Sequence, residues 1–218
     1  MELVIGNKNY SSWSLRGWLV LKWFDLPFTE VGLLLDTDSF KQQIAQYSEA
    51  GKVPVLIDNG LRVWDSLAIA EYVNDAYLQG AGWPRDPADR ALARAISCEM
   101  HSGFFNLRQE MPMNCRARRE LTVSDACAGE IRRIDRIWSA LRQRFAERGP
   151  WLFGERSIAD AMFAPVALRF HTYGSELSEL ANEYMQTVLN DVAIREWIGA
   201  AQMELQVLDA EEKGVPAD

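Results

Sequence analysis

Cysteine and histidine are scarce in this chain of 218 residues, which holds three cysteines and two histidines. The cysteines, at Cys98, Cys115 and Cys127, form no Cys-x-x-Cys pair, and their odd number does not complete a disulfide framework. His101 and His171 lie far apart, so no cluster has the spacing of metal ligands. We therefore expect a chain without disulfides or a bound metal, folded in a reducing compartment.

Positive charge is also in deficit, because 23 Lys and Arg stand against 31 Asp and Glu, for a formal net charge of -8. A surface of this sign repels nucleic acid. The arginines between residues 116 and 148 alternate with Glu or apolar residues at helical spacing, which favours a solvated helix face. No apolar run has the length of a membrane span, and residues 1–6 do not resemble a signal peptide. We expect a cytoplasmic protein with no nucleic-acid or membrane partner.

Apolar residues, by contrast, make up 48% of the chain and are patterned in two ways. In residues 1–79 short apolar runs alternate with helical patterns, which predicts the order β-α-β-α-β-β-α around a small mixed sheet. Residues 80–87 contain Gly-Ala-Gly-Trp-Pro and indicate a linker. Residues 88–218 show long helical periodicities and almost no strand signal. The fold class predicted is an α/β first domain followed by an all-α second domain.

The element boundaries follow from the same patterns. Strands are expected at 3–5, 28–35, 55–57 and 61–64, with helices after the polar turn at 10–14, at 40–47 and at 67–77. Helices of the second domain are expected at Ala88–Gln109, Ser124–Gly149, Ser157–Tyr173, Glu176–Leu189 and Ala193–Gln206. Residues 211–218 are expected to form a loose tail.

The turn from Tyr10 to Arg16 reads Tyr-Ser-Ser-Trp-Ser-Leu-Arg and joins the first strand to the first helix. Free backbone N–H groups and the helix dipole favour an anion, such as a thiolate, at this place. A neighbouring hydroxyl can donate a hydrogen bond to the thiolate and so lower the thiol pKa. Taken alone, however, the pattern favours a serine that only caps the helix.

Two further short motifs follow the turn. Val53-Pro54 precedes a strand, where a cis peptide would leave the backbone of Val53 free to pair with a bound peptide, although an ordinary trans proline is the simpler interpretation. Asp65-Ser66 opens a helix, where Ser66 can hold a ligand carboxylate and Asp65 an ammonium group. Helix capping is again the alternative.

The joint order of these motifs resembles the glutathione transferase superfamily over nearly the whole chain. The resemblance is strongest at Ser11–Arg16, Lys52–Leu56 and Asp65–Tyr72, and Ser157-Ile-Ala-Asp160 resembles the family's N-capping box. It implies a thioredoxin-like, glutathione-binding first domain with a cis Pro54, glutathione as co-substrate, and a homodimer. The residues that it places against glutathione are Lys41, Lys52, Val53, Pro54, Asp65 and Ser66.

Within the superfamily the serine turn is most similar to the zeta class, whose turn reads Ser-Ser-Cys-Ser before a basic residue, whereas this chain has Trp13 in place of the cysteine. The position of the thiol-activating residue falls on Ser11, with Ser12 second and Tyr10 a minor candidate. For the electrophile pocket, location in the family fold gives the candidates Trp13, His101, Phe104, Phe105 and Arg108, with core or dimer packing as the alternative.

Three functions are consistent with the resemblance. The favoured one is a glutathione transferase whose serine hydroxyl activates the thiol for attack on a small electrophile. The second is a zeta-like isomerase that uses glutathione to convert maleylacetoacetate. The third is a binding protein that keeps the fold without turnover. The sequence leaves the physiological electrophile and the pathway open.

Overall fold

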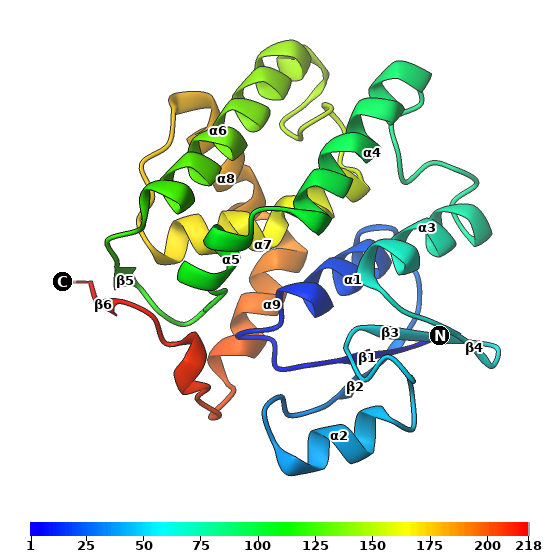
Figure 1. Cartoon of the computed structure of the whole chain (residues 1–218). Helices are drawn as coiled ribbons and strands as arrows, with labels where there is room; N and C mark the ends of the chain where they lie inside the picture. Colours follow the sequence, from blue (N-terminus) through cyan, green and yellow to red (C-terminus); the bar gives the residue numbers. More distant parts are fainter. Residues whose placement is uncertain (218) are drawn as a thin grey trace.

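The first part of the chain builds a four-stranded sheet with helices on both faces, in a computed structural model that describes residues 1–217. The strand order is β2-β1-β3-β4, with β1 parallel to β2 and β3 antiparallel to both β1 and β4. Helices α1 and α3 lie between the sheet and the helical domain, and α2 covers the opposite face (Figure 1). The elements are β1 (Glu2–Ile5), α1 (Ser12–Trp23), β2 (Thr29–Gly32), α2 (Asp38–Ile44), β3 (Val55–Asp58), β4 (Leu61–Val63) and α3 (Ser66–Ala76). The predicted β-α-β-α-β-β-α order is thereby confirmed.

The side chains of β1 and β3 alternate between the two faces of the sheet, and each face has its own apolar cluster. Leu3 and Leu56 point into the main core shared with α1 and α3, whereas Val4 and Val55 join Ile44 of α2 in a smaller cluster on the other face. All five side chains are almost completely buried. Because successive side chains of a strand face opposite sides of the sheet, short apolar runs suit strands that are covered on both faces.

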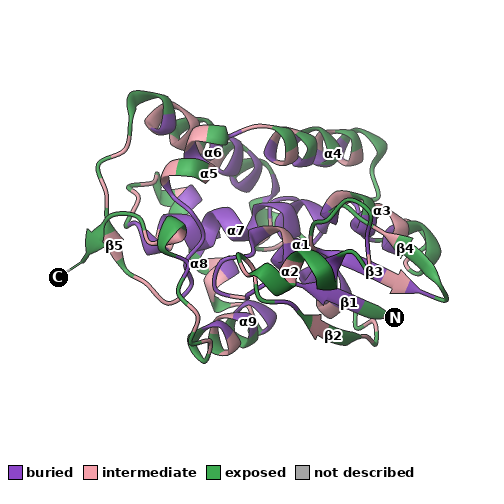
Figure 2. Cartoon of the chain, turned by 60° about the horizontal axis from the view of Figure 1, so that its bottom comes forward, coloured by how far each residue is buried: buried purple, intermediate pink, exposed green. Residues whose placement is uncertain are grey.

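The second part is helical, with one helix enclosed by the others. Helix α7 is mostly apolar, with Asp160 and Arg169 as its buried charged residues, and every one of its residues except His171 is buried. Figure 2 shows it as the purple centre of the helical domain, and it packs against α1, α4 and α8. The helical elements are α4 (Pro87–Ser102), α5 (Phe105–Glu110), α6 (Asp125–Phe145), η1 (Ala146–Arg148), α7 (Ile158–Thr172), α8 (Glu179–Asn190), α9 (Val192–Gln202) and η2 (Asp209–Glu211).

The predicted capping box at the start of α7 is confirmed. Asp160 accepts hydrogen bonds from the backbone N–H of Ser157 at 2.9 Å and of Leu152 at 3.0 Å, and from the hydroxyl of Tyr184 at 3.0 Å. Burial raises the pKa of Asp160 to about 6, against the opposing effect of these hydrogen bonds. One buried carboxyl therefore joins the start of α7, the preceding loop and α8.

The single helix predicted for residues 88–109 is wrong, because the chain breaks between α4 and α5. Gly103 leaves the helical conformation, and Phe104 adopts a left-handed backbone with φ 54°. A Cβ atom at Gly103 would lie 2.8 Å from the backbone oxygen of Glu99, so glycine is required for this helix end. The break redirects α5, and Arg108 then reaches the cleft described below.

The expectation of a loose tail at residues 211–218 is also wrong for the part that the structure describes; Asp218 lies outside it. Glu212 accepts hydrogen bonds from the hydroxyl of Tyr10 at 2.7 Å and the amide of Asn114 at 2.8 Å, and it pairs with Arg119. Strand β6 (Val215–Pro216) pairs with β5 (Arg119–Glu120), two short strands that the sequence patterns missed. These contacts hold the end of the chain against the first turn.

Candidate functional site

A cleft lies over the start of α1 and consists of two adjoining cavities of about 450 and 430 Å³. Both cavities are lined by Trp13, Lys52 and Val53, which makes them parts of one site. The first, the α3 side of the cleft, is lined in addition by Ala50, Pro54, Trp64, Asp65 and Ser66. The second, the serine side of the cleft, is lined in addition by Tyr10, Ser11, Ser12, Leu35, Phe40, Gly51, Arg108, Arg169 and Glu211.

Ser11 is the N-cap of α1, so the residue proposed to activate a thiol is also the residue that caps the helix. Its Oγ lies 2.7 Å from the Oγ of Ser14 and 3.4 Å from the backbone N of Ser14. Ser14 Oγ in turn accepts the backbone N–H of Gly6 at 3.0 Å. When Ser14 donates to Ser11, the proton of the Ser11 hydroxyl is left for a group in the cleft. Capping and thiol activation are therefore compatible.

Ser12 is held by an arginine that the sequence analysis missed. The guanidinium of Arg169, on α7, donates to Ser12 Oγ at 3.2 Å and to the carbonyl oxygen of Met111. Arg169 is buried, and burial lowers its pKa to about 10. The signal was present in the sequence, because Arg169 is the one basic residue in the otherwise apolar stretch 161–170.

Arg169 is one of three arginines that converge beside Trp13. The guanidinium carbons of Arg16 and Arg108 lie 4.4 and 5.3 Å from the centre of the Trp13 ring. Burial and the Arg169 and Arg108 cations lower the pKa of Arg16 to about 9. Among residues 1–217, none of the three forms an ion pair with a carboxylate. Positive charge without a direct ion pair favours an anion in the adjoining cleft.

On the α3 side of the cleft, Ser66 carries a hydroxyl that is buried and has no hydrogen-bond partner in the described part of the chain. It is the first residue of α3, where backbone N–H groups are also free. A buried polar atom without a partner is costly, so this place fits a ligand carboxylate. Asp65 caps the same helix through the N–H of Leu67 at 2.8 Å and pairs with His101 Nε2 at 3.1 Å.

Not every residue proposed for the site lies in the cleft. Val53–Pro54 is a cis peptide, as expected, and both residues line the α3 side. Lys41 is exposed on α2 and lines neither cavity. His101 lines neither cavity either, but it lies behind the lining residues, 5.3 Å from Trp13 between ring centroids and paired with Asp65.

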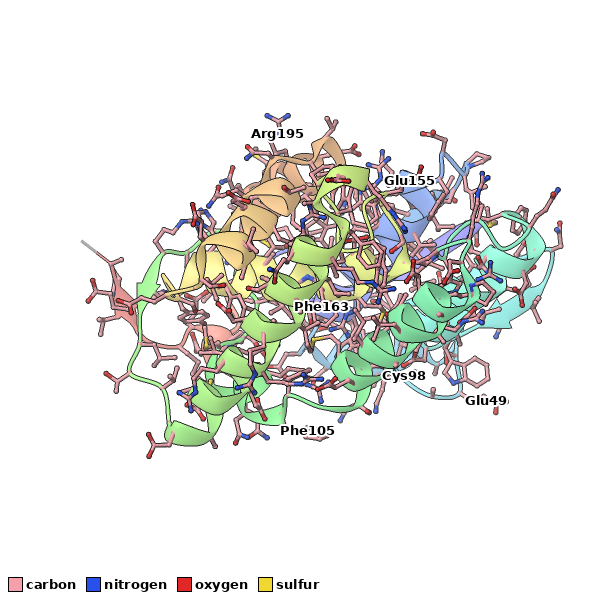
Figure 3. All side chains as sticks on the ribbon, turned by 90° about the horizontal axis from the view of Figure 1, so that it is seen from above. Glu49, Cys98, Phe105, Glu155, Phe163 and Arg195 are labelled. Atoms are coloured by element: carbon pink, nitrogen blue, oxygen red, sulfur yellow. The ribbon has the colours of Figure 1, made fainter. Side chains whose placement is uncertain are left out.

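The two phenylalanines proposed for the electrophile pocket also lie outside the cavities. Phe104 is buried in the core, whereas Phe105 is largely exposed and carries Arg108 over its ring at 4.7 Å. Figure 3 shows Phe105 at the periphery of the molecule and Phe163 in its packed interior.

Tyr10 reaches the cleft with its ring, but its hydroxyl is engaged elsewhere. The hydroxyl donates to Glu212 at 2.7 Å and accepts from Arg116 at 2.8 Å and from the backbone N of Leu208 at 3.3 Å. Burial and Glu212 raise the pKa of Tyr10. Tyr10 therefore anchors the end of the chain, and Ser11 and Ser12 are the hydroxyls directed to the cleft.

Three other features of residues 1–217 lie outside the cleft. These residues contain no group of three His, Cys, Asp or Glu residues that could hold a metal ion. In the same residues, no helix is both long and apolar enough to cross a bilayer. A separate cavity of about 570 Å³ includes Trp83 and Asp89, but the carboxylate of Asp89 is already paired with Arg144 and Arg148.

The class defined by the fold and the site is a four-stranded mixed sheet with a cis proline, joined to a helical domain, with a cleft over the start of α1 beside arginines that form no ion pair within residues 1–217. Comparison with family models gives the same result. Residues 10–76 match the model of the glutathione S-transferase N-terminal domain, and residues 117–200 match that of the C-terminal domain. The chain belongs to the glutathione S-transferase family.

Curated relatives include isomerases. The chain is 26% identical to the maleylacetoacetate isomerase of Pseudomonas aeruginosa, over 81% of this chain and 84% of that protein. It is 37% identical to a probable maleylacetoacetate isomerase of Caenorhabditis elegans, but only over 43% of this chain and 42% of that protein. The match to the nematode protein thus spans less than half of either chain.

Solved structures share the fold over almost the full length. A glutathione transferase homolog from Burkholderia gl BGR1 with bound glutathione superposes with a TM-score of 0.69 at 23% identity, covering 93% of this chain and 98% of that one. A bacterial zeta-class maleyl pyruvate isomerase gives a TM-score of 0.71 at 20% identity, covering 94% and 99%. At these identities the likeness concerns the fold.

Proposed function

We propose that this chain is a glutathione transferase that holds glutathione across the cleft and activates its thiol with the hydroxyl of Ser11. The observation that carries the proposal is that one cleft contains hydroxyls suited to both ends of the peptide. At one end the buried Ser66 hydroxyl has no hydrogen-bond partner among residues 1–217, and at the other Ser11 and Ser12 line the wall at the start of α1.

The residues divide the work by their chemistry. Ser66 and the start of α3 bind a carboxylate of the peptide, Asp65 its ammonium group, and the backbone of Val53 its central amide. Lys52 lines both cavities and supplies positive charge to the peptide carboxylates. Lys41 lies away from both cavities and reaches them only if its long side chain turns inward.

The thiol end depends on electrostatics. A hydrogen bond from Ser11, the dipole of α1 and the buried cations of Arg16 and Arg169 all favour the thiolate over the thiol. A thiol with a pKa of about 8.5 is mostly protonated at neutral pH, and lowering that pKa by roughly two units makes the thiolate the major form. The thiolate then attacks an electrophile held beside Trp13 and Arg108.

A second function is favoured by one observation: among residues 1–217, neither Arg108 nor Arg169 on the serine side of the cleft forms an ion pair with a carboxylate. Free guanidiniums suit a substrate that carries carboxylates. Relatives named maleylacetoacetate isomerase support a glutathione-dependent isomerase of an unsaturated diketo acid. The serine turn and the cleft are common to both functions.

Retention on immobilised glutathione, followed by two assays, tests these functions. We expect retention and measurable conjugation of 1-chloro-2,4-dinitrobenzene. Turnover of maleylacetoacetate at a much higher kcat/KM would favour the isomerase. Retention without turnover of either substrate would instead indicate a binding protein, and absence of retention would contradict the proposal.

Replacing Ser66 with alanine will weaken glutathione binding. A hydrogen bond to a charged group is worth about 1.5–3 kcal/mol, so we expect the Kd to rise by roughly 10- to 100-fold. The free energy of unfolding should stay unchanged or increase slightly, since the hydroxyl is buried without a partner in the free protein. Calorimetric titration and urea denaturation measure the two quantities. Ser102→Ala, outside the cleft, is the matched control, and an unaltered Kd for Ser66→Ala would refute the role.

The remaining assignments rest on family membership. We propose a homodimer, which sedimentation equilibrium will detect as twice the chain mass, and we propose domains at residues 1–79 and 88–218. The cytoplasmic location stays a prediction.

A further inference from the structure

The last part of the chain crosses the junction between the two domains and is fastened to the first turn. Glu204 accepts the backbone N–H groups of Lys8 at 2.7 Å and Asn9 at 2.9 Å. Further along, the amide of Gln206 donates to the carbonyl oxygen of Leu35 at 2.9 Å. We call residues 203–217 the C-terminal strap. The hydrogen bonds of Glu204 and Gln206 on one side, and those of Glu212 on the other, fix the position of residues 209–211.

The strap places one acidic side chain in the cleft. Glu211 ends the short helix η2 and lines the serine side of the cleft together with Ser11, Ser12, Arg108 and Arg169. It is the one acidic residue that lines that cavity in the described part of the chain. Glu211 is half-buried, and its burial raises the pKa of the carboxyl, with Arg169 acting in the opposite direction.

The position of Glu211 matters because, among residues 1–217, its carboxylate acts on the buried cation of Arg169, which forms no ion pair. Arg169 donates its hydrogen bonds to Ser12 and to backbone oxygens, all of them neutral. Glu211 forms no ion pair with Arg169, but burial lowers the pKa of that guanidinium and the Glu211 carboxylate acts through space to raise it. A carboxylate at this place therefore competes, through space, with any substrate anion that Arg169 attracts.

We propose that Glu211 is a specificity-determining residue that limits the negative charge an electrophile can bring into the serine side of the cleft. The inference rests on the proposed function and deepens it. Arg108 and Arg169 attract an anionic electrophile, and Glu211 lowers its affinity in proportion to its charge. The preference of the arginines for dicarboxylates over singly charged electrophiles is thus smaller than it would be without Glu211.

Binding of maleate, a dianion, and of its monomethyl ester, a monoanion, tests the inference without requiring turnover. Calorimetric titrations with glutathione present, at about pH 8 where a carboxyl is ionised, compare the wild type with Glu211→Gln. Two charges several ångströms apart near a protein surface interact enough to change affinity by about fivefold, so we expect Glu211→Gln to bind the ester about fivefold and maleate about 20-fold more tightly.

Asp209→Asn is the matched control, because it removes the same charge from the same short helix at an exposed position outside the cavity. It should leave both affinities within about twofold. Thermal unfolding of each variant checks that the strap remains in place. Equal gains for both anions, equal gains in both variants, or no detectable maleate binding to Glu211→Gln would overturn the inference. Failure of glutathione itself to bind the wild type would instead count against the proposed function.

Discussion

Replacing Ser11 with alanine will lower the turnover of 1-chloro-2,4-dinitrobenzene by more than about tenfold while glutathione still binds. A hydrogen bond from a hydroxyl to a thiolate is a charge-assisted bond, and its loss raises the pKa of the bound thiol. The pH profile of turnover should therefore move to higher pH. Steady-state kinetics across pH, together with titration of glutathione, measure the three effects.

Ser12→Ala is the informative comparison for this prediction. Ser12 lines the same cavity and accepts its hydrogen bond from Arg169, so its loss perturbs the cleft without removing the N-cap of α1. We expect a smaller loss of turnover and no shift of the pH profile. If Ser12→Ala shows the larger loss and Ser11→Ala is unaffected, the thiol is activated by Ser12.

Replacing Asp160 with alanine will destabilise the fold by about 4 kcal/mol, which corresponds to a fall in Tm of roughly 10 °C for a chain of this size. The substitution leaves the N–H groups of Leu152 and Ser157 and the hydroxyl of Tyr184, all of them in the interior, without their hydrogen-bond acceptor. Each buried donor without a partner costs about 1–3 kcal/mol. Urea denaturation followed by circular dichroism measures the loss.

Asp135→Ala is the matched control for the destabilisation. Asp135, on α6, likewise accepts from the backbone N and hydroxyl of an N-cap serine, Ser178 of α8, but near solvent, where water replaces the lost bonds. A loss of at most about 1 kcal/mol is expected there. A loss of comparable size in the two variants would contradict the account of the buried capping box.

The pH dependence gives a second check on Asp160. Because its folded-state pKa is raised to about 6, above the value of an unfolded chain, the folded protein retains this proton as the pH rises from about 4 to about 6. The wild type should lose stability relative to Asp160→Asn as the pH rises through that range. The opposite slope would mean that the hydrogen bonds outweigh burial.

The parts of this structure that could be predicted from sequence are those fixed by local chemistry. The hairpin at Asn59-Gly60 follows from residues that accept positive φ, and the capping box at Ser157 and Asp160 follows from their spacing. The buried strand Leu3–Ile5 follows from its apolar run. In each case the signal lies within a few neighbouring residues.

The parts that could not be predicted depend on contacts between distant residues. A single glycine is tolerated inside a helix pattern, so Gly103 alone does not predict a helix end. In the structure α4 ends there, and the next residue, Phe104, has a left-handed backbone. The bond between Tyr10 and Glu212 joins residues 202 positions apart, beyond the reach of any periodicity. For that reason the C-terminal strap, and with it Glu211, was missing from the predicted site.

The most direct test of the central claim is the pKa of the glutathione thiol when it is bound in the cleft. Thiolate absorbance near 240 nm, followed as a function of pH with the protein saturated, gives this value. The account predicts a pKa roughly two units below that of free glutathione in the same buffer, and a return towards the free value in Ser11→Ala. A bound thiol with an unaltered pKa in the wild type would contradict the claim that the serine turn activates it.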